Sequence, residues 1–271
     1  MKITILGTGN AQVTECYNTC FVLTDELPDG EKKYLMVDGG GGGTILRQLK
    51  YAGLKWQDMR DIFLTHRHLD HIMGIVWMMR MICQNISRGN YEGEARIYGH
   101  GEVQGILREM AEKLLEKKDF AHVGKSLHLI EVKDGESHTI IGHNVTFFDI
   151  GSTKAKQFGF SMDMGKGEKL TCLGDEPFAE CERSYAENSK WLLSEAFCLY
   201  GQRDIFKPYE KHHSTVREAC ELAEQLKVPN LILYHTEDRN ILQRKKLYTE
   251  EGKQFYHGNL FVPDDLDVLE L

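Results

Sequence analysis

The stretch His66-Arg67-His68-Leu69-Asp70-His71 decides how this sequence is interpreted. It holds four potential metal ligands within six residues, between the apolar runs 61–65 and 72–82. We expect a strand that ends at the first histidine and a helix that follows the last one. Such a strand end projects imidazole nitrogens and a carboxylate into one cleft, and these atoms suit zinc, and also iron, nickel or manganese. A polar turn with coincidental histidines is the competing interpretation, and the flanking strand and helix patterns disfavour it.

The composition describes an ordinary globular chain with an acidic balance. Of the 271 residues, 41% are hydrophobic and 27% are charged, which is enough apolar material for a sizeable core. Lys and Arg number 33 against 41 Asp and Glu, so the formal net charge is −8. Proteins that bind phosphate backbones usually carry the opposite balance, so nucleic acid is disfavoured as a partner.

The cysteines and the apolar segments indicate the expected compartment and domain count. Residues 1–7 form too short an apolar run for a signal peptide, and no segment approaches the length that spans a membrane. The seven cysteines are odd in number and scattered, which indicates reduced thiols in a cytoplasm. Since there is no proline-rich linker and no short repeat, residues 1–271 are predicted to form one domain.

Apolar alternation and turn residues predict a β-rich first part, a helix, a second β-rich part and a helical end. Strands are expected at 2–6, 18–24, 33–38, 61–65, 95–98, 127–132, 138–141, 144–150, 158–164, 169–173 and 231–234. Helices are expected at 44–52, 72–82, 105–118 and 214–226. The segment 25–32, with Pro28 and Gly30, is predicted to be a hairpin loop. Short turns between the early strands favour an antiparallel or mixed sheet over a nucleotide-binding βαβ unit.

A run of five glycines, Gly39 to Gly43, directly follows Asp38. The run lacks the lysine and hydroxyl residue of a P-loop and the spacing of a dinucleotide fingerprint. We therefore expect glycine here because the backbone passes too close to the metal cleft for side chains to fit.

Two further candidate ligands follow strands in the same way as the first cluster. Asp175 comes just after the predicted strand 169–173, and His235 directly follows the strand 231–234. Each is a weak signal alone, since an aspartate after a glycine is usually a turn former. Their repeated placement at strand ends is what a shared metal cleft predicts.

Together these segments resemble the metallo-β-lactamase fold superfamily of metal-dependent hydrolases, and the resemblance covers nearly the whole chain. It is closest to the branch of tRNA 3′-processing endonucleases and their phosphodiesterase relatives. The resemblance implies a four-layer αββα sandwich of two mixed β-sheets flanked by helices. The segments that carry it are 5–9, 37–40, 66–71, Gly174-Asp175, His213-Ser214-Thr215 and His235.

The resemblance also implies roles for the candidate residues. His66 and His68 would hold a first metal ion, Asp70, His71 and His235 a second, and Asp175 would bridge the two ions. A metal-bound hydroxide would be the nucleophile, and Asp70 would help to orient it. His213 would donate a proton or stabilise an oxyanion at the leaving group, unless it is a surface residue at a helix N-terminus.

Two histidines of the family pattern are absent. The family usually has one more ligand of the first ion shortly before an aromatic-glycine pair, which is Phe158-Gly159 here. Residues 149–154 contain no histidine, and Ser152 or Thr153 stands about where it is expected. The first site is therefore expected to be weakened, completed by Asp149 or water, or dependent on another metal. The family's His-Glu-Ala element is Ser194-Glu195-Ala196, so Glu195 lacks its expected partner.

Two segments bear on the substrate. The tRNA processors carry a long insertion after the absent histidine, whereas only a short hairpin around 165–167 precedes Asp175 here. The segment Tyr200–His213 mixes basic and aromatic residues, and it either caps the cleft over an anionic substrate or is an ordinary surface loop.

The leading hypothesis is a hydrolase of a small anionic phosphodiester or related ester that uses one or two divalent ions, zinc first. Three alternatives stay open: a degenerate metal-binding protein of the same fold, a tRNA 3′-processing endonuclease, and an iron enzyme with redox or thioester chemistry. The resemblance also allows a homodimer, which is common in this fold, and it implies no membrane partner.

Overall fold

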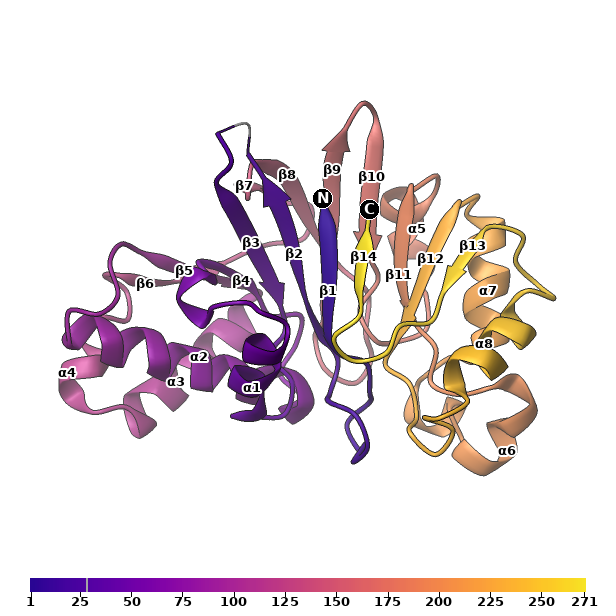
Figure 1. Cartoon of the computed structure of the whole chain (residues 1–271), viewed down its shortest axis with the longest axis horizontal. Coiled ribbons are helices and arrows are strands. Elements are labelled where there is room, and N and C mark those ends of the chain that lie inside the picture. Colours follow the sequence, from indigo (N-terminus) through magenta and orange to yellow (C-terminus); the bar gives the residue numbers. More distant parts are fainter. Residues whose placement is uncertain (28) are drawn as a thin grey trace.

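Two β-sheets packed face to face form the centre of the structure, with helices on their outer sides (Figure 1). The computed structural model describes residues 1–27 and 29–271, and in these residues each sheet has seven strands. Pro28, which belongs to the predicted hairpin loop, lies outside the described residues. The predicted four-layer arrangement of two mixed sheets flanked by helices is confirmed.

The first sheet and its helices come mainly from the first half of the chain. In spatial order its strands are β14 (Val268–Glu270), β1 (Lys2–Gly7), β2 (Cys20–Glu26), β3 (Lys32–Val37), β4 (Asp61–Phe63), β5 (Ala95–Gly99) and β6 (Leu127–Glu131). The strands pair antiparallel from β14 to β3 and parallel from β3 to β6. The connections that the parallel part requires contain α1 (Thr44–Tyr51), the short helix η1 (Trp56–Asp58), α2 (Leu69–Ser87), α3 (Gly101–Leu114) and α4 (Lys117–Phe120).

The second sheet repeats this division. In spatial order its strands are β13 (Asn259–Phe261), β12 (Asn230–Tyr234), β11 (Trp191–Glu195), β10 (Glu168–Cys172), β9 (Phe158–Gly165), β8 (His143–Asp149) and β7 (Ser137–Ile140). Strands β10 to β13 are parallel, and β7 to β10 are antiparallel. The helices of this half are η2 (Glu180–Glu182), α5 (Arg183–Ala186), η3 (Tyr200–Gln202), α6 (Arg203–Phe206), η4 (Tyr209–Lys211), α7 (Val216–Gln225) and α8 (Arg244–Gly252).

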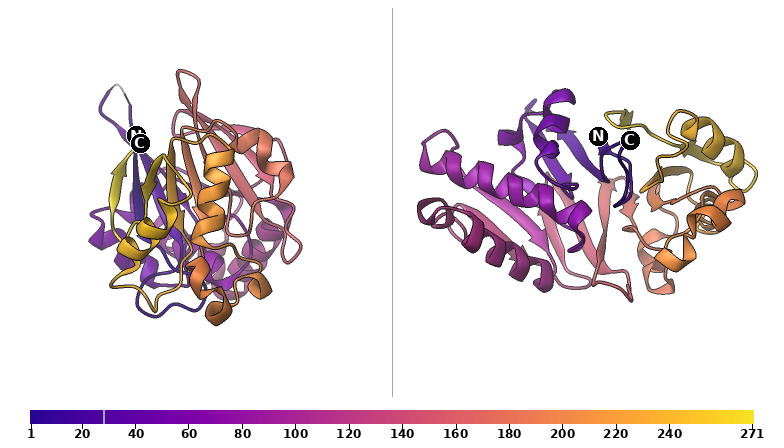
Figure 2. Two further views of the ribbon diagram at one scale, coloured as in Figure 1. Left: turned by 90° about the vertical axis from the view of Figure 1, so that its right-hand side faces the viewer. Right: turned by 90° about the horizontal axis from the view of Figure 1, so that it is seen from below.

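Apolar side chains fill three layers, which explains the order of sheets and helices. One layer lies between α1–α3 and the first sheet, and another lies between α7–α8 and the second sheet (Figure 2). The middle layer joins the two sheets through packed aromatic rings. The ring centroid of Phe63 on β4 lies 4.8 Å from that of Phe147 on β8 and 5.7 Å from that of Phe160 on β9.

The glycine run after Asp38 makes a close backbone approach to helix α2, whereas its predicted approach to the metal cleft stays a prediction. Gly39 lies against Gly74 on α2, and a Cβ added at Gly74 would meet the carbonyl oxygen of Gly39 at 1.7 Å. Two backbone hydrogen bonds fix this contact, from Gly39 N to His71 O and from Gly74 N to Gly40 O, both 2.9 Å long. The first turn of α2 is therefore held directly against the end of β3.

Helix α2 begins earlier than the apolar pattern predicted. Its first residue is Leu69, not Ile72, because the backbone of His68 is extended (φ −64°, ψ 149°) and ends the preceding segment. The helix predicted at 105–118 is also different: α3 ends at Leu114 and α4 starts at Lys117. In the described part of the chain, no helix combines the length and the apolar character needed to cross a membrane.

Candidate metal centre

The first sheet contributes the predicted ligands of residues 66–71. Strand β4 ends at Phe63, and the extended segment after it carries His66 and His68 toward the second sheet. Asp70 and His71 lie in the first turn of α2, where the helix dipole favours a negatively charged carboxylate. Both side chains are buried, with Asp70 7% exposed and His71 1% exposed.

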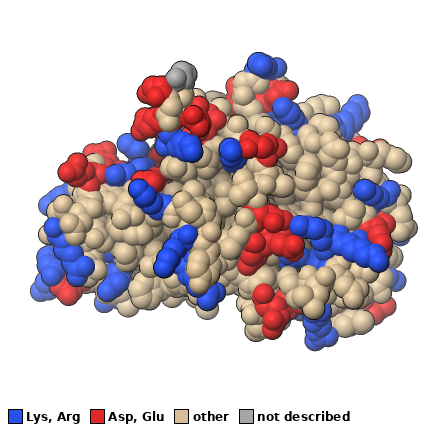
Figure 3. Space-filling view, viewed as in Figure 1, with Lys and Arg blue, Asp and Glu red and all other residues tan. Residues whose placement is uncertain are grey.

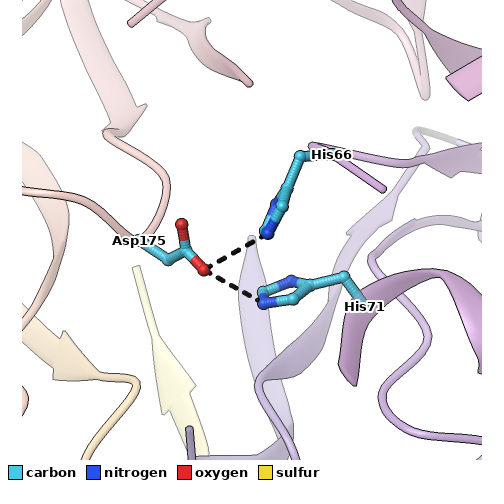
Figure 4. Close-up of side chains that lie close together, drawn as sticks. All are labelled: His66, His71 and Asp175. Carbon is cyan, nitrogen blue, oxygen red and sulfur yellow. Dashed lines mark ion pairs between the residues drawn. The ribbon is translucent and has the colours of Figure 1, made fainter. Parts of the chain in front are cut away.

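The second sheet contributes Asp175 and His235. Strands β10, β11 and β12 are parallel, so their carboxyl ends lie at the same edge of the sheet. Asp175 follows β10, and His235 follows β12 with a left-handed backbone (φ 58°). Figure 4 shows the side chain of Asp175 directed toward the imidazoles of His66 and His71 from the opposite side.

Four atoms from these residues form a group, here called the cage, in which each carboxylate oxygen lies close to both imidazole nitrogens. The Oδ2 atom of Asp70 lies 3.3 Å from His71 Nε2 and 3.6 Å from His235 Nε2. The Oδ2 atom of Asp175 lies 3.2 Å from His71 Nε2 and 3.4 Å from His235 Nε2. Neighbouring ligand atoms of a tetrahedral ion with bonds of about 2.1 Å are about 3.4 Å apart, which is close to these four carboxylate-to-imidazole distances. These residues therefore fit a divalent metal such as zinc.

Unsatisfied nitrogen atoms support the same conclusion. Among the described residues, His71 Nε2 and both ring nitrogens of His235 are buried without a hydrogen-bond partner. Buried polar atoms in folded proteins nearly always have a partner. A bound ion would satisfy the two Nε2 atoms that face the cage.

The first predicted position is less complete. His66 Nε2 lies 2.8 Å from His68 Nδ1 and 3.5 Å from Asp175 Oδ2, so the described residues give this position three donor side chains. Asp149 does not join them: its Oδ1 accepts the backbone N–H of Gly151 at 2.9 Å, and its Oδ2 lies 3.7 Å from Lys156 Nζ. The Asp149 alternative is therefore not supported by its contacts.

Asp38 orients the cage and was not predicted as a site residue. Its Oδ2 atom lies 2.7 Å from His71 Nδ1, which leaves His71 Nε2 to face the cage. Thr65 donates its backbone N–H to Asp38 Oδ1 and its hydroxyl to Asp38 Oδ2, at 2.9 and 2.8 Å. A carboxylate behind a ligand histidine is a common means of fixing the ring and raising its basicity. The sequence signal was an aspartate at a strand end, directly before the glycine run.

The charges of the site favour a cation. Burial raises the pKa values of Asp70 and Asp175, but the surrounding histidines more than offset this and hold both pKa values below the usual range. Burial lowers the pKa of His66 well below its usual value, so this imidazole is neutral. Burial also lowers the pKa of His71, but Asp70 and Asp38 outweigh it and the net shift is upward. The carboxylates are thus ionised, and the negative charge that raises the pKa of His71 equally favours a divalent cation in place of that proton.

His213 borders the cage from the segment before α7. Its Nδ1 lies 2.9 Å from the carbonyl oxygen of Asp175, and its ring stacks on Phe197 with centroids 4.8 Å apart. Burial lowers the pKa of His213 to about 3, and the charge of Lys154 adds to this effect. His213 is therefore neutral, with its proton on Nδ1, and Nε2 remains to exchange a proton with a molecule in the cleft.

Glu195 has a different partner from the histidine that the family pattern expects. Its carboxyl oxygen Oε1 accepts the backbone N–H of Ser214, and Oε2 lies 3.7 Å from His213 Nδ1. Burial raises the pKa of Glu195 well above its usual value, so the group is protonated. Glu195, His213 and His235 form a further group whose ligand atoms lie within 4.8 Å of one another.

A cleft of about 560 Å³ opens over these residues. The segment Tyr200–His213 forms part of its wall through Glu210, Lys211 and His213. The remaining lining residues are Asn10, Ala11, Gln12, His68, Leu69, Asp70, Lys154, Asp175, Glu176, Phe197 and His235. The cleft is large enough for a small organic anion, and its lysines could pair with one.

Comparison with known proteins supports the fold and the branch. The model of a protein family described as anti-Pycsar protein Apyc1 matches residues 1–255. A ribonuclease Z from Nitrosopumilus maritimus is 24% identical over 312 residues, with 99% of each chain covered. The metallo-β-lactamase fold protein YhfI from Bacillus subtilis has a TM-score of 0.76 at 18% identity and covers 99% of this chain and 98% of its own. The short form of human tRNase Z has a TM-score of 0.74 at 21% identity and covers 100% and 99%. These likenesses confirm the predicted metallo-β-lactamase fold, and the ribonuclease Z and tRNase Z matches agree with the predicted resemblance to that branch.

Proposed function

The chain belongs to the family of anti-Pycsar protein Apyc1, and on that basis we propose that it is a metal-dependent hydrolase of a small phosphodiester. The observation that carries the proposal is the cage of Asp70, His71, Asp175 and His235, with carboxylate-to-imidazole distances of 3.2 to 3.6 Å. Asp70, Asp175 and His235 also line the cleft. Each half of the molecule supplies two of the four ligand atoms.

Three aspartates have different proposed roles in hydrolysis. When bound, a divalent ion supplies Lewis acidity and an activated water. Asp70 and Asp175 hold that charge, and Asp70, which lines the cleft, also accepts a hydrogen bond from the attacking water. Asp38 keeps His71 in the orientation that the cage needs, through the 2.7 Å contact at Nδ1.

His213 is the proposed proton donor at the leaving group. It is neutral in the free protein, and a phosphoryl anion beside it would raise its pKa and so favour a proton on Nε2. The carbonyl of Asp175 and the face of Phe197 hold the ring in place. This fixed position suits a group that transfers a proton to a leaving group bound in the cleft.

The charge and shape of the protein support a small substrate. Strands β9 and β10 are joined by a short hairpin at residues 166–167. The chain therefore has no counterpart there of the long insertion that the resemblance implies for a tRNA processor. On the face shown in Figure 3, basic side chains are interspersed with acidic ones. A net charge of −8 is unfavourable for a long polyanion, but Lys154 and Lys211 in the cleft can pair with a single phosphodiester.

A tRNA 3′-processing endonuclease is the second candidate. It is favoured by the curated relatives, since ribonuclease Z of Nitrosopumilus maritimus aligns with 99% of the chain. The cage and His213 would serve both reactions, so the two candidates differ in how the substrate is held outside the cleft.

The test is hydrolysis by protein purified without added metal and then analysed for bound ions. We expect turnover of bis-p-nitrophenyl phosphate and cyclic mononucleotides, and loss of both turnover and bound ion in His235→Ala. His257→Ala is the matched control, because His257 is a surface histidine with a side chain 82% exposed. If the protein cleaves a precursor tRNA at its 3′ end faster than it hydrolyses the small phosphodiesters, tRNA is the substrate and the small phosphodiester is not. A metal-loaded protein that hydrolyses no member of a phosphodiester and ester panel would refute the proposal and favour the degenerate binding protein.

A further inference from the structure

Lys154 stands in the segment where the family pattern expects another histidine ligand. The segment lies between β8 and β9, and it brings Lys154 into the wall of the cleft that His68 and Asp175 also line. From the sequence alone, no role is assigned to this lysine. In the structure it lines the cleft, as His68 of the less complete first position also does.

Lys154 is exposed, but its backbone N–H and its ammonium both make contacts. Its backbone N–H lies 3.3 Å from the hydroxyl of Ser152, and that hydroxyl donates to Glu176 Oε1 at 2.8 Å. Its ammonium donates to the backbone carbonyl of Lys211 on the opposite loop. These contacts connect the two loops that border the cleft, and they hold the positive charge over it.

Lys154 lines the same cleft as His68 and His213. An ammonium in the wall of that cleft repels a second cation inside it and attracts an anion.

We infer that Lys154 supplies the second positive charge of this site. One divalent ion binds to Asp70, His71, Asp175 and His235, and the Lys154 ammonium binds a non-reacting phosphoryl oxygen of the substrate on the side of His68. Lysine is a common phosphate ligand and acts there as a point charge. The inference rests on the proposed function, because it assumes a substrate with a phosphoryl group.

Two measurements that need no turnover test the inference. The first is the number of zinc ions bound per chain after dialysis, for which we expect one. The second is the affinity of the zinc-loaded protein for inorganic phosphate, measured by titration calorimetry. Lys154→Gln should leave the zinc count at one and weaken phosphate binding by about tenfold or more, the loss typical of one charged hydrogen bond.

The controls separate charge from structure. Lys156 lies two positions further along the same segment, and its Nζ is 3.7 Å from Asp149 Oδ2. The variant Lys156→Gln should therefore leave phosphate binding unchanged. Lys154→Arg keeps the charge and should retain most of the affinity. Two zinc ions of similar affinity in the wild type, or unchanged phosphate binding in Lys154→Gln, would overturn the inference. If both results hold but no phosphodiester is hydrolysed, the proposed function fails and the phosphate site stands.

Discussion

Replacing Asp38 by asparagine tests how the cage is oriented, because the change removes one charge and almost no volume. Asparagine adopts the left-handed backbone more readily than other residues with a side chain, so the φ of 57° at position 38 is tolerated. Its amide oxygen can still accept the backbone N–H of Thr65, which lies 2.9 Å from Asp38 Oδ1. What is lost is the carboxylate 2.7 Å from His71 Nδ1.

The magnitude follows from the burial of that contact. The side chains of His71 and Asp38 are 2% and 5% exposed, so water does not replace the lost carboxylate. Loss of such a partner behind a ligand histidine typically lowers metal affinity 10- to 100-fold, or about 1.4 to 2.7 kcal/mol. We expect this range for zinc binding by Asp38→Asn, with an unchanged number of ions at saturating zinc.

The assay is competition for zinc with a chromophoric chelator, at one pH and one ionic strength. Asp25→Asn is the matched control, because Asp25 Oδ2 also lies 2.7 Å from an imidazole nitrogen, that of His143. It should leave zinc affinity unchanged, since neither residue contributes a ligand atom to the cage. A zinc affinity of Asp38→Asn within twofold of the wild type would refute the role assigned to Asp38.

Further predictions concern catalysis, pH dependence and packing. His213→Gln should lower kcat for bis-p-nitrophenyl phosphate by about 10²- to 10⁴-fold, the usual contribution of a proton-transfer group, with the zinc count unchanged. Burial raises the pKa of Glu182 from 4.5 to about 8, so the folded protein binds the extra proton between these values and its stability falls as the pH rises through them. The ceiling is 8 − 4.5 = 3.5 pKa units, or about 5 kcal/mol at ~1.4 kcal/mol per unit, and Glu182→Gln should flatten this decline in urea unfolding at pH 5 and pH 8. Gly74→Ala should lower Tm in thermal unfolding because its Cβ would meet the Gly39 carbonyl at 1.7 Å, whereas Gly105→Ala on α3, with no atom within 4 Å of its Cβ, should be neutral or stabilising. An unchanged Tm for Gly74→Ala would contradict the close packing of α2.

The sequence predicted the ligand cluster well because its signal is local. A strand, a short turn and a helix N-terminus fix the directions of His66, Asp70 and His71 within a few residues of one another. The glycine run was predictable for the same reason, since glycine reports the space around its own backbone.

Two elements could not be predicted because the residues that they bury do not show the expected pattern of a strand or helix. Strand β11, Trp191–Glu195, is buried along its whole length and shows no alternation. Helix α8 faces the core with Arg244, Tyr248 and Gly252, and only the tyrosine resembles a core residue in the sequence. Arg244 is fully buried because the hydroxyls of Thr8 and Thr236 accept its guanidinium hydrogens.

Asp38 and Lys154 were missed for a different reason. Each acts through a partner that is distant in the sequence: His71 for Asp38, and Lys211 for Lys154. A single aspartate or lysine has many ordinary uses, and only the folded arrangement distinguishes this one. The incomplete first position was predictable as an absence, but the cation that stands beside it was not.

The cage also has a mechanical consequence for the whole molecule. Asp70 and His71 belong to the layer of the first sheet, whereas Asp175 and His235 follow strands of the second. An ion bound to all four residues is a cross-link between the sheets, and it closes the long chain segment between His71 and Asp175 and the shorter one between Asp175 and His235. Because unfolding must release the ion, free zinc at 100 times its dissociation constant adds about 2.7 kcal/mol to the free energy of unfolding. The bound ion would thus stabilise the packing of the two sheets on each other at the edge of the aromatic layer. Removal of the ion by a chelator would lower the free energy of unfolding.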